Sequence, residues 1–245
     1  MRTLVLSDVH ANLEALRAVL ADARQRRWEQ VWVLGDLVGY GAEPEAAVRE
    51  VRALEPGVLV RGNHDKVVSG IESAEGFNVA ARAAVEWTHQ ALSADSLEFL
   101  RGLTRGPVVA APGIWVAHGA PLDEDEYLLE GASAAAQFDA GDFSLCFIGH
   151  THIACVFSLR AGRLDRIAPP PAGGMRLWPG ERHLFNPGSV GQPRDRDPRA
   201  AYAIYDTARG EIEHYRVAYD VQKAARKILD AGLPATLAQR LASGI

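Results

Sequence analysis

The feature that most constrains the fold is a repeated pattern near the start of the chain, in which a short apolar segment ends abruptly in polar residues. It occurs at residues 3–8 (TLVLSD), 31–36 (VWVLGD) and 58–65 (VLVRGNHD), and the two intervening segments carry apolar residues at helical spacing. Strands that alternate with amphipathic helices indicate β-α-β units and a largely parallel sheet. The sequence therefore predicts an α/β fold.

Two further stretches are predicted to be helical. Residues 67–104 read as a helical insertion, and residues 221–245 read as a helical tail that is interrupted near the sequence AGLP. No Pro-, Gly- or Ser-rich linker suggests a domain boundary. We therefore predict one domain over residues 1–245.

More strands follow the helical insertion. Residues 114–119 and 145–150 repeat the apolar pattern that ends in polar residues. From residue 151 onward, short β-like segments with close turns predict an antiparallel second sheet, with a loop at 168–174.

Composition excludes several classes of partner. The net charge is −5, so stable binding to nucleic acid or to an anionic membrane is not expected. No run of about 18 apolar residues occurs, which predicts no membrane span. The two cysteines, Cys146 and Cys155, lie in apolar segments without the C-x-x-C spacing of a zinc-thiolate site. With no signal-peptide pattern at the start, we expect a cytoplasmic location.

Polar motifs follow the predicted strands at the point where each strand ends. They are SDVH (7–10), GD (35–36), GNHD (62–65), AHG (117–119) and GHTH (149–152), and they hold five of the eight histidines. The carboxyl edge of an open α/β sheet is where loops converge to bind ligands. We therefore expect one site built from Asp8, His10, Asp36, Asn63, His64, Asp65, His118, His150 and His152.

The residue types indicate a metal site. Carboxylate, imidazole and amide donors without thiolate suit Mn, Fe, Zn, Co or Ni. The donors outnumber the needs of one ion, so we expect two divalent ions, manganese first, and Asp36 is the candidate bridging ligand because its strand is expected to be central. In extended backbone, residues i and i+2 face the same side, so His150 and His152 are expected to face the same cluster and to serve one ion each.

The charge of such a site predicts its substrate. Two divalent ions outweigh the charges of Asp8 and Asp36, so the pocket suits a phosphoryl group, and a bridging water with its pKa lowered toward about 7 would be the nucleophile. His64 is followed directly by Asp65. We expect Asp65 to orient His64, and His64 to stabilise the phosphoryl oxygens and to protonate the leaving group.

In this order and spacing, the five motifs resemble those of the calcineurin-like metallophosphoesterase superfamily. Residues 186–206 (NPGSVGQPRDRDPRAAYAIYD) are similar to the later part of its small bacterial members. The resemblance implies a four-layer α/β/β/α sandwich of two mixed β-sheets flanked by helices.

The resemblance also implies how the site residues are used. It gives one metal the ligands Asp8, His10, Asp36 and His152, and the other metal Asp36, Asn63, His118 and His150. It matches His64 and Asp65 to the histidine–aspartate pair of the family. It further implies that a metal-bound hydroxide attacks phosphorus without a phospho-enzyme intermediate.

One departure from the family pattern narrows the function. Protein serine/threonine phosphatases and symmetrical diadenosine tetraphosphate hydrolases of this superfamily carry GDxVDRG, whereas residues 35–41 read GDLVGYG and lack its phosphate-clamping arginine. We predict a phosphoesterase that hydrolyses a phosphate ester or phosphodiester of a small molecule or nucleotide. A diadenosine-polyphosphate hydrolase or a protein phosphatase-like activity is the alternative.

Two other classes are disfavoured. A non-catalytic scaffold of this fold would be expected to lack metal ligands, and this chain carries a residue at every position assigned above. A nuclease is disfavoured by the net charge and by the lack of a basic, aromatic-rich stripe.

Three more residues are candidates for substrate binding. Asn12 could contact substrate or cap the following helix. Tyr40 could stack on a base or pack at the rim, and Arg194 could reach a phosphate or lie in a solvated turn. Substrate specificity is expected to come from residues 66–112, 119–144 and 160–180.

Overall fold

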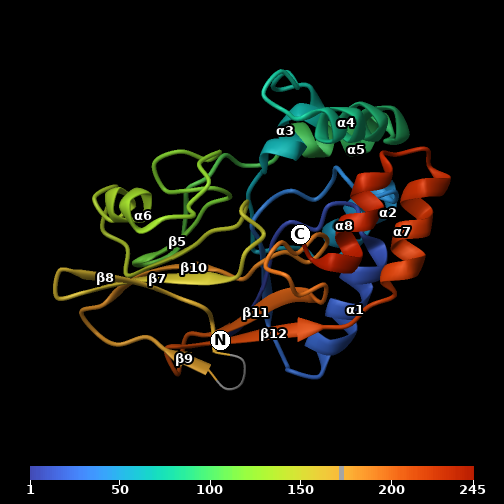
Figure 1. The fold of residues 1–245 in the computed structure, drawn as a ribbon. Coiled ribbons are helices and arrows are strands. Elements are labelled where there is room, and N and C mark those ends of the chain that lie inside the picture. The colour runs from blue at the N-terminus through green and yellow to red at the C-terminus, as the bar shows by residue number, and fades with distance from the viewer. Residues whose placement is uncertain (171–173) are drawn as a thin grey trace.

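The computed structural model describes residues 1–170 and 174–245, and its strands form two six-stranded mixed sheets with helices outside them (Figure 1). The predicted α/β fold of two mixed sheets flanked by helices is confirmed. The loop predicted at 168–174 lies partly outside the described residues.

The first sheet has the strand order β3-β2-β1-β11-β12-β9. Its first three strands are parallel, and β11 pairs antiparallel with both β1 and β12. The strands are β1 (Arg2–Leu6), β2 (Gln30–Val33), β3 (Val58–Leu59), β9 (Gly174–Arg176), β11 (Ala200–Asp206) and β12 (Glu211–Val217).

The second sheet has the order β4-β5-β6-β10-β7-β8. Its centre is parallel, from β5 through β6 to β10, and both of its edges are antiparallel. The strands are β4 (Val108–Ala111), β5 (Ile114–Val116), β6 (Leu145–Phe147), β7 (Cys155–Arg160), β8 (Arg163–Ile167) and β10 (Arg182–Asn186).

The prediction that the strands after residue 151 form an antiparallel sheet of their own is wrong. β11 and β12 complete the first sheet, and β7, β8 and β10 join the second. The reason lies in β11, which is buried along its whole length. Tyr202 and Ile204 pack beneath the helices, whereas Ala203 and Tyr205 face the other sheet. A strand with two apolar faces is stable only inside a sheet that is covered on both sides.

Helices cover the outer faces of both sheets. Helix α1 packs on β11 and β12 and contacts α7, whereas α6 lies against β8 on the far side of the molecule (Figure 1). The helices are α1 (Leu13–Arg24), α2 (Pro44–Arg52), α3 (Asn63–Ser69), α4 (Val79–Ala91), α5 (Ala94–Arg101), α6 (Gly131–Gln137), α7 (Val221–Asp230) and α8 (Ala235–Ser243).

The core follows the two-residue period of the strands. In β1, Leu4 and Leu6 pack under the helices, whereas Val5 faces the second sheet beside Phe147 and Phe185. A separate apolar cluster joins α6 to the outer face of the second sheet. These three apolar layers separate four layers of secondary structure.

The helical predictions agree with the described helices. Helices α4 and α5 lie within the predicted insertion, and the predicted tail contains α7 and α8, which are interrupted at residues 231–234. In the part of the chain that the structure describes, no helix has both the length and the apolar character needed to cross a membrane. That the whole chain is one domain stays a prediction.

Candidate metal centre and active site

Two groups of buried side chains meet where the strands end. The first group is Asp8, His10, Asp36 and His152, and within it one donor atom from each residue lies within 4.8 Å of the others. The second is Asp36, His118 and His150, by the same measure. Asp36 belongs to both groups. The structure thus brings together residues that are up to 144 positions apart in the sequence.

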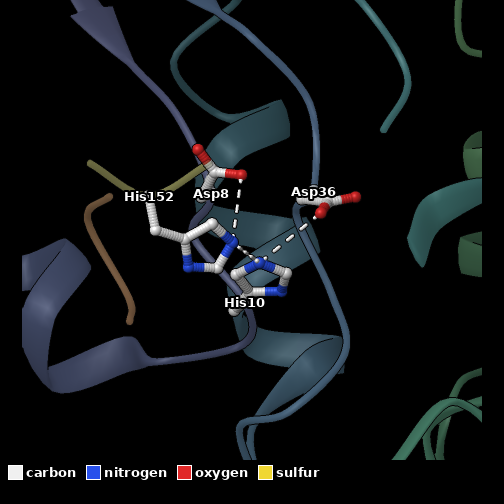
Figure 2. A group of neighbouring side chains, drawn as sticks. All are labelled: Asp8, His10, Asp36 and His152. Carbon is white, nitrogen blue, oxygen red and sulfur yellow. Dashed lines mark hydrogen bonds and ion pairs between the residues drawn. The ribbon is translucent and has the colours of Figure 1, made fainter. Parts of the chain in front are cut away.

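In the first group, two imidazoles face two carboxylates (Figure 2). The Nε2 atoms of His10 and His152 are 3.1 Å apart. His10 Nε2 lies 3.4 Å from Asp36 Oδ2, and His152 Nε2 lies 3.4 Å from Asp8 Oδ1. All three distances are longer than the N–O distance of a charge-assisted hydrogen bond, which is about 2.7–2.9 Å.

The second group surrounds the same carboxylate oxygen from the other side. His118 Nε2 lies 3.5 Å from Asp36 Oδ2, 3.1 Å from His150 Nδ1 and 3.3 Å from Asn63 Oδ1. Asn63 thus lies beside the second group, as predicted from its motif. Asp36 Oδ2 is buried, and it has no hydrogen-bond partner among the described residues.

Backbone carbonyls fix the orientation of three imidazoles. The Nδ1 atoms of His10, His118 and His152 lie 2.6–3.0 Å from the carbonyl oxygens of Val38, Leu34 and Gln192, respectively. A carbonyl only accepts, so each Nδ1 carries the proton and each Nε2 is left to act as a donor atom for a metal.

These contacts test whether a metal fits the site. The Nε2 lone pairs of His10 and His152 would face each other at 3.1 Å beside the unpartnered oxygen of Asp36. Lone pairs and a carboxylate at this distance repel one another unless a cation lies between them. The nitrogen and oxygen donors, without sulfur, suit a divalent transition metal. The residues present therefore fit the predicted ions.

Burial decides the electrostatics of the site. It lowers the pKa of His10 to about 4 and holds the pKa values of His150 and His152 well below their usual range. Burial also lowers the pKa of His118, but the neighbouring Asp36 and Asp8 carboxylates outweigh it and raise this pKa to about 10. Most of the imidazoles are therefore neutral, with lone pairs available to a cation.

Comparisons with known proteins identify the family. The family model for the calcineurin-like phosphoesterase superfamily domain matches residues 1–210. A metallophosphoesterase from Sphaerobacter thermophilus has a solved structure that is similar with a TM-score of 0.89 and 40% identity, covering 100% of this chain and 99% of that one. The chain belongs to the calcineurin-like phosphoesterase superfamily.

Other relatives match this phosphoesterase over different fractions of its length. An uncharacterized protein of Methanocaldococcus jannaschii is 39% identical over 98% of this chain and 97% of its own length. A symmetrical bis(5'-nucleosyl)-tetraphosphatase of Serratia proteamaculans is 40% identical over 67 residues, which is 26% of this chain and 24% of that enzyme. A hypothetical protein from Pyrococcus horikoshii has a similar fold, with a TM-score of 0.82 at 18% identity over 100% of this chain and 98% of its own.

The backbone at this phosphoesterase site is unusual. Six of the predicted residues adopt the left-handed region, with φ between 47° and 65°: Asp8, His10, Asp36, Tyr40, His150 and His152. Non-glycine residues rarely adopt this conformation, and such strain concentrates at functional sites. The preceding strands end two to seven residues before these positions.

The expected geometry of His150 and His152 is therefore wrong. Strand β6 ends at Phe147, so both histidines lie in a turn and not in extended backbone. Asn186 fixes this turn, because its Nδ2 donates to Gly149 O at 2.7 Å and to Thr151 Oγ1 at 3.0 Å. His150 consequently joins the second group and His152 the first.

The expected contact between Asp65 and His64 is also wrong. The Asp65 carboxylate accepts from the backbone N–H groups of Leu37, Val38 and Gly62. The reason is helical geometry, because α3 begins at Asn63 and successive side chains on a helix diverge. Asp65 caps the helix and ties it to the loop after Asp36. His64 Nδ1 is buried without a partner among the described residues.

The three substrate-binding candidates have different positions. Asn12 caps α1 by accepting from Ala15 N, and its Nδ2 donates to Gly191 O at 2.8 Å, so its capping role is confirmed and its contact with substrate stays a prediction. Tyr40 is buried, with its ring centroid 4.6 Å from that of His10 and 4.3 Å from that of His64. It therefore packs against the site.

Arg194 lies beside the first group. Its guanidinium carbon is 5.6 Å from the centroid of the Tyr40 ring, and its Nη2 donates to Gln192 Oε1 at 2.9 Å. Over residues 1–170 and 174–245, no carboxylate lies within ion-pair distance of this guanidinium. The charge of Arg194 therefore acts on the site, where it helps to lower the pKa values of His10, His64 and His152.

Sequence reasoning missed two aromatic residues at the site. Phe77 has its ring 4.8 Å from that of His64, and Tyr127 has its ring 3.7 Å from that of His150. Both line a cavity of about 280 Å³ beside the candidate metal donors. They lie in the segments from which specificity was expected, but neither occurs in a motif that could have singled it out.

Proposed function

We propose that the protein is a two-metal phosphoesterase that hydrolyses a phosphate ester or phosphodiester of a small molecule or nucleotide. The observation that carries this proposal is the buried Asp36 Oδ2, which has no hydrogen-bond partner among residues 1–170 and 174–245 and lies 3.4 Å and 3.5 Å from imidazole nitrogens of the two donor groups. A carboxylate oxygen shared by two sets of nitrogen and oxygen donors is the arrangement that a pair of divalent ions needs.

The donor groups divide into two sets of ligands. Asp8, His10, Asp36 and His152 would hold one ion, and Asp36, Asn63, His118 and His150 would hold the other. We take manganese as the first candidate, with Fe, Zn, Co and Ni as alternatives. The ions, when bound, would supply a water of lowered pKa as nucleophile and positive charge for the phosphoryl oxygens.

Two residues of the chain would act on the substrate beside these ligands. Arg194 has a guanidinium that no carboxylate of the described residues pairs with, so it can donate to phosphoryl oxygens. Burial lowers the pKa of His64 to about 3, so this imidazole is neutral before substrate binds. The negative charge of a bound phosphate favours its protonation, which suits a group that donates to the leaving oxygen.

Asp65 would act only through the backbone. Its bonds to Leu37 N and Val38 N connect α3 to the loop that follows Asp36. It would therefore hold His64 and Asp36 at a fixed separation, which is a positioning role.

The cytoplasm remains the proposed compartment. Cys146 and Cys155 are both buried and free, as expected in a reducing environment.

A diadenosine-polyphosphate hydrolase is the second candidate. It is favoured by the 67-residue similarity to the symmetrical bis(5'-nucleosyl)-tetraphosphatase. Tyr40 occupies the position of the arginine in GDxVDRG, which counts against this activity and against a protein phosphatase-like activity alike.

The test compares bis-p-nitrophenyl phosphate with p-nitrophenyl phosphate on metal-stripped protein, with and without manganese. We expect manganese-dependent turnover that disappears in Asp36→Asn. We also expect His64→Ala to keep its metal, measured by elemental analysis, while losing about 10²–10⁴ in rate. Absence of turnover with every divalent metal tried, or full activity in either variant, would contradict the proposal.

A further inference from the structure

The cavity beside the metal donors has walls of two distinct chemistries. It has a volume of about 280 Å³ and opens between the segment before α4 and the loop before α6. Its lining includes Phe77 and Tyr127, which are aromatic, and Glu72 and Asp125, which are acidic. His64, the residue proposed to protonate the leaving group, also lines it.

The aromatic residues are held against the active-site histidines. Phe77 packs on His64 and Tyr127 packs on His150, with ring centroids 4.8 Å and 3.7 Å apart. Tyr127 is nevertheless 48% exposed, so much of its ring remains free to contact a ligand. A flat apolar group in the cavity would therefore contact an aromatic surface directly beside the reacting atoms.

The acidic residues share one buried cation. Lys66 is 1% exposed, and its Nζ lies 2.9 Å from Glu72 Oε1 and 2.5 Å from Asp125 Oδ2. Glu124 contacts this lysine at 3.4 Å but also pairs with Arg61 at 2.8 Å. One positive charge therefore faces two carboxylates at the cavity wall.

The second oxygen of Asp125 is available as an acceptor. Asp125 Oδ1 is buried and has no hydrogen-bond partner in the described part of the chain. A buried acceptor of this kind is stabilised by a hydroxyl or amino donor, and it repels an anion. Arg194, which has no carboxylate partner in the described part of the chain, lies beside the first metal group next to Tyr40, and its positive charge also acts on Tyr127.

We infer that this cavity receives the leaving group of the substrate, and that this group is an uncharged or cationic alcohol with an apolar face and hydrogen-bond donors. The inference rests on the proposed phosphoesterase function and adds to it the chemical class of the substrate. The phosphoryl charge is placed toward Arg194 and the metal donors, and the alcohol is placed against Phe77, Tyr127 and Asp125.

The volume agrees with one compact group, such as a nucleoside or a substituted phenol, and not with a peptide segment. A leaving group that carries its own phosphate would bring negative charge against Glu72 and Asp125. The cavity therefore favours esters over the phosphoanhydride of a dinucleoside polyphosphate.

The reaction is a hydrolysis in which the bond between phosphorus and the alcohol oxygen breaks. Water supplies the oxygen of the new P–O bond, and the departing alkoxide or phenoxide takes a proton. No oxidant and no co-substrate other than water is needed.

The test uses two aryl esters of similar size, 4-acetylphenyl phosphate and 4-carboxyphenyl phosphate, or their methyl diesters if the protein prefers diesters. Both are assayed with manganese on the full chain. The wild type should prefer the neutral leaving group, and Asp125→Asn should reduce the ratio of the two kcat/KM values by about tenfold. Intrinsic reactivity differs between the phenols, but it cancels when the ratio is compared between proteins.

Controls separate the charge of the cavity from general damage. Glu130→Gln removes a charge from an exposed position on the same loop, outside the cavity lining, and should leave the ratio unchanged. Glu72→Gln should reduce the ratio as Asp125→Asn does, and it serves if the latter folds poorly. Binding of the free phenols, 4-hydroxyacetophenone and 4-hydroxybenzoate, measured by saturation-transfer NMR, gives the same comparison without turnover.

The outcomes distinguish the two proposals. If neither ester is hydrolysed with any divalent metal, the proposed function fails. If both are hydrolysed but the ratio does not change in Asp125→Asn and Glu72→Gln, the function stands and the assignment of the cavity is overturned.

Discussion

Gly39 offers a sharp test of how His64 is positioned. Its φ is +86°, and a Cβ added there would lie 2.3 Å from His64 Nδ1 and 3.0 Å from His64 Cγ. Carbon contacts are normally about 3.5 Å or longer, so Gly39→Ala must displace the imidazole by about 1 Å. The ring cannot move freely, because Tyr40, Phe77 and His10 pack around it.

The size of the effect follows from this displacement. Moving a catalytic group by 1 Å costs about 10²-fold in rate, so we predict a loss of about 10² in kcat for Gly39→Ala. Gly39→Ala should also lower the free energy of unfolding. Placing alanine in left-handed backbone costs about 1–2 kcal/mol, and overpacking against His64 costs about 1–3 kcal/mol more. The rate is measured with bis-p-nitrophenyl phosphate and manganese, the metal content by elemental analysis, and the stability by urea unfolding.

Gly70 supplies the matched control. It ends α3, the helix that carries His64, and its φ of +81° is nearly the same, but a Cβ there meets no atom within 4 Å. Gly70→Ala should therefore lose only the backbone contribution, about 1–2 kcal/mol, and keep its rate. Wild-type kcat in Gly39→Ala, or an equal loss of rate in Gly70→Ala, would refute the reasoning.

Two further predictions concern stability. Lys66→Met should lower the free energy of unfolding by about 2–3 kcal/mol at neutral pH, because Glu72 and Asp125 lose the buried cation that pairs with them and remain only partly exposed to water. Urea unfolding measures this loss beside that of the exposed control Lys223→Met, and equal losses in the two variants would contradict the prediction. Burial lowers the pKa of His214 to about 4, against about 6.5 in an unfolded chain, so the unfolded state binds this proton more tightly and stability falls as pH drops from about 6.5 to 4, by at most about 3 kcal/mol. His214→Gln can retain the hydrogen bond to Pro187 O, and it should lose less stability on acidification than the wild type. If the unfolding free energies of the wild type and the variant fall equally with pH, His214 is not the cause.

The position of the site was predictable because it depends on strand ends. Asp8 and Asp36 follow β1 and β2, and these parallel neighbours bring their carboxyl ends to one edge of the sheet. His118 and His150 follow β5 and β6 in the second sheet, which are also parallel neighbours. Residue types at strand ends are therefore enough to indicate the candidate metal donors.

The sheet membership of later strands was not predictable from local pattern. Strand β11 is separated from its partner β1 by almost 200 residues, and its pairing depends on which apolar faces remain uncovered after the rest of the chain has packed. The contacts of Asp65 depend likewise on where α3 begins. A one-residue shift in the start of that helix would point a different side chain at Leu37 N.

The substrate surface was the least predictable part, for a physical reason. Metal donors need particular atoms, so they carry a residue signature, whereas a cavity wall needs only a ring or a charge at the right place. Phe77 and Tyr127 each pack on an active-site histidine from a segment between helices or strands. Such segments can change without disturbing the donors.

The departure from GDxVDRG and the position of His64 depend on each other. Gly39 stands where that motif has aspartate, and the His64 ring occupies the space that any side chain at position 39 would need. Tyr40 stands in the place of the arginine and packs between His10 and His64, so no cation reaches the site from this loop. Arg194 lies beside the Tyr40 ring instead, and it is held by its backbone N–H, which donates to His152 O, and by its side chain, which donates to Gln192. The positive charge that would meet the phosphate thus comes from the segment after β10, and a protein with this arrangement needs no arginine after Asp36.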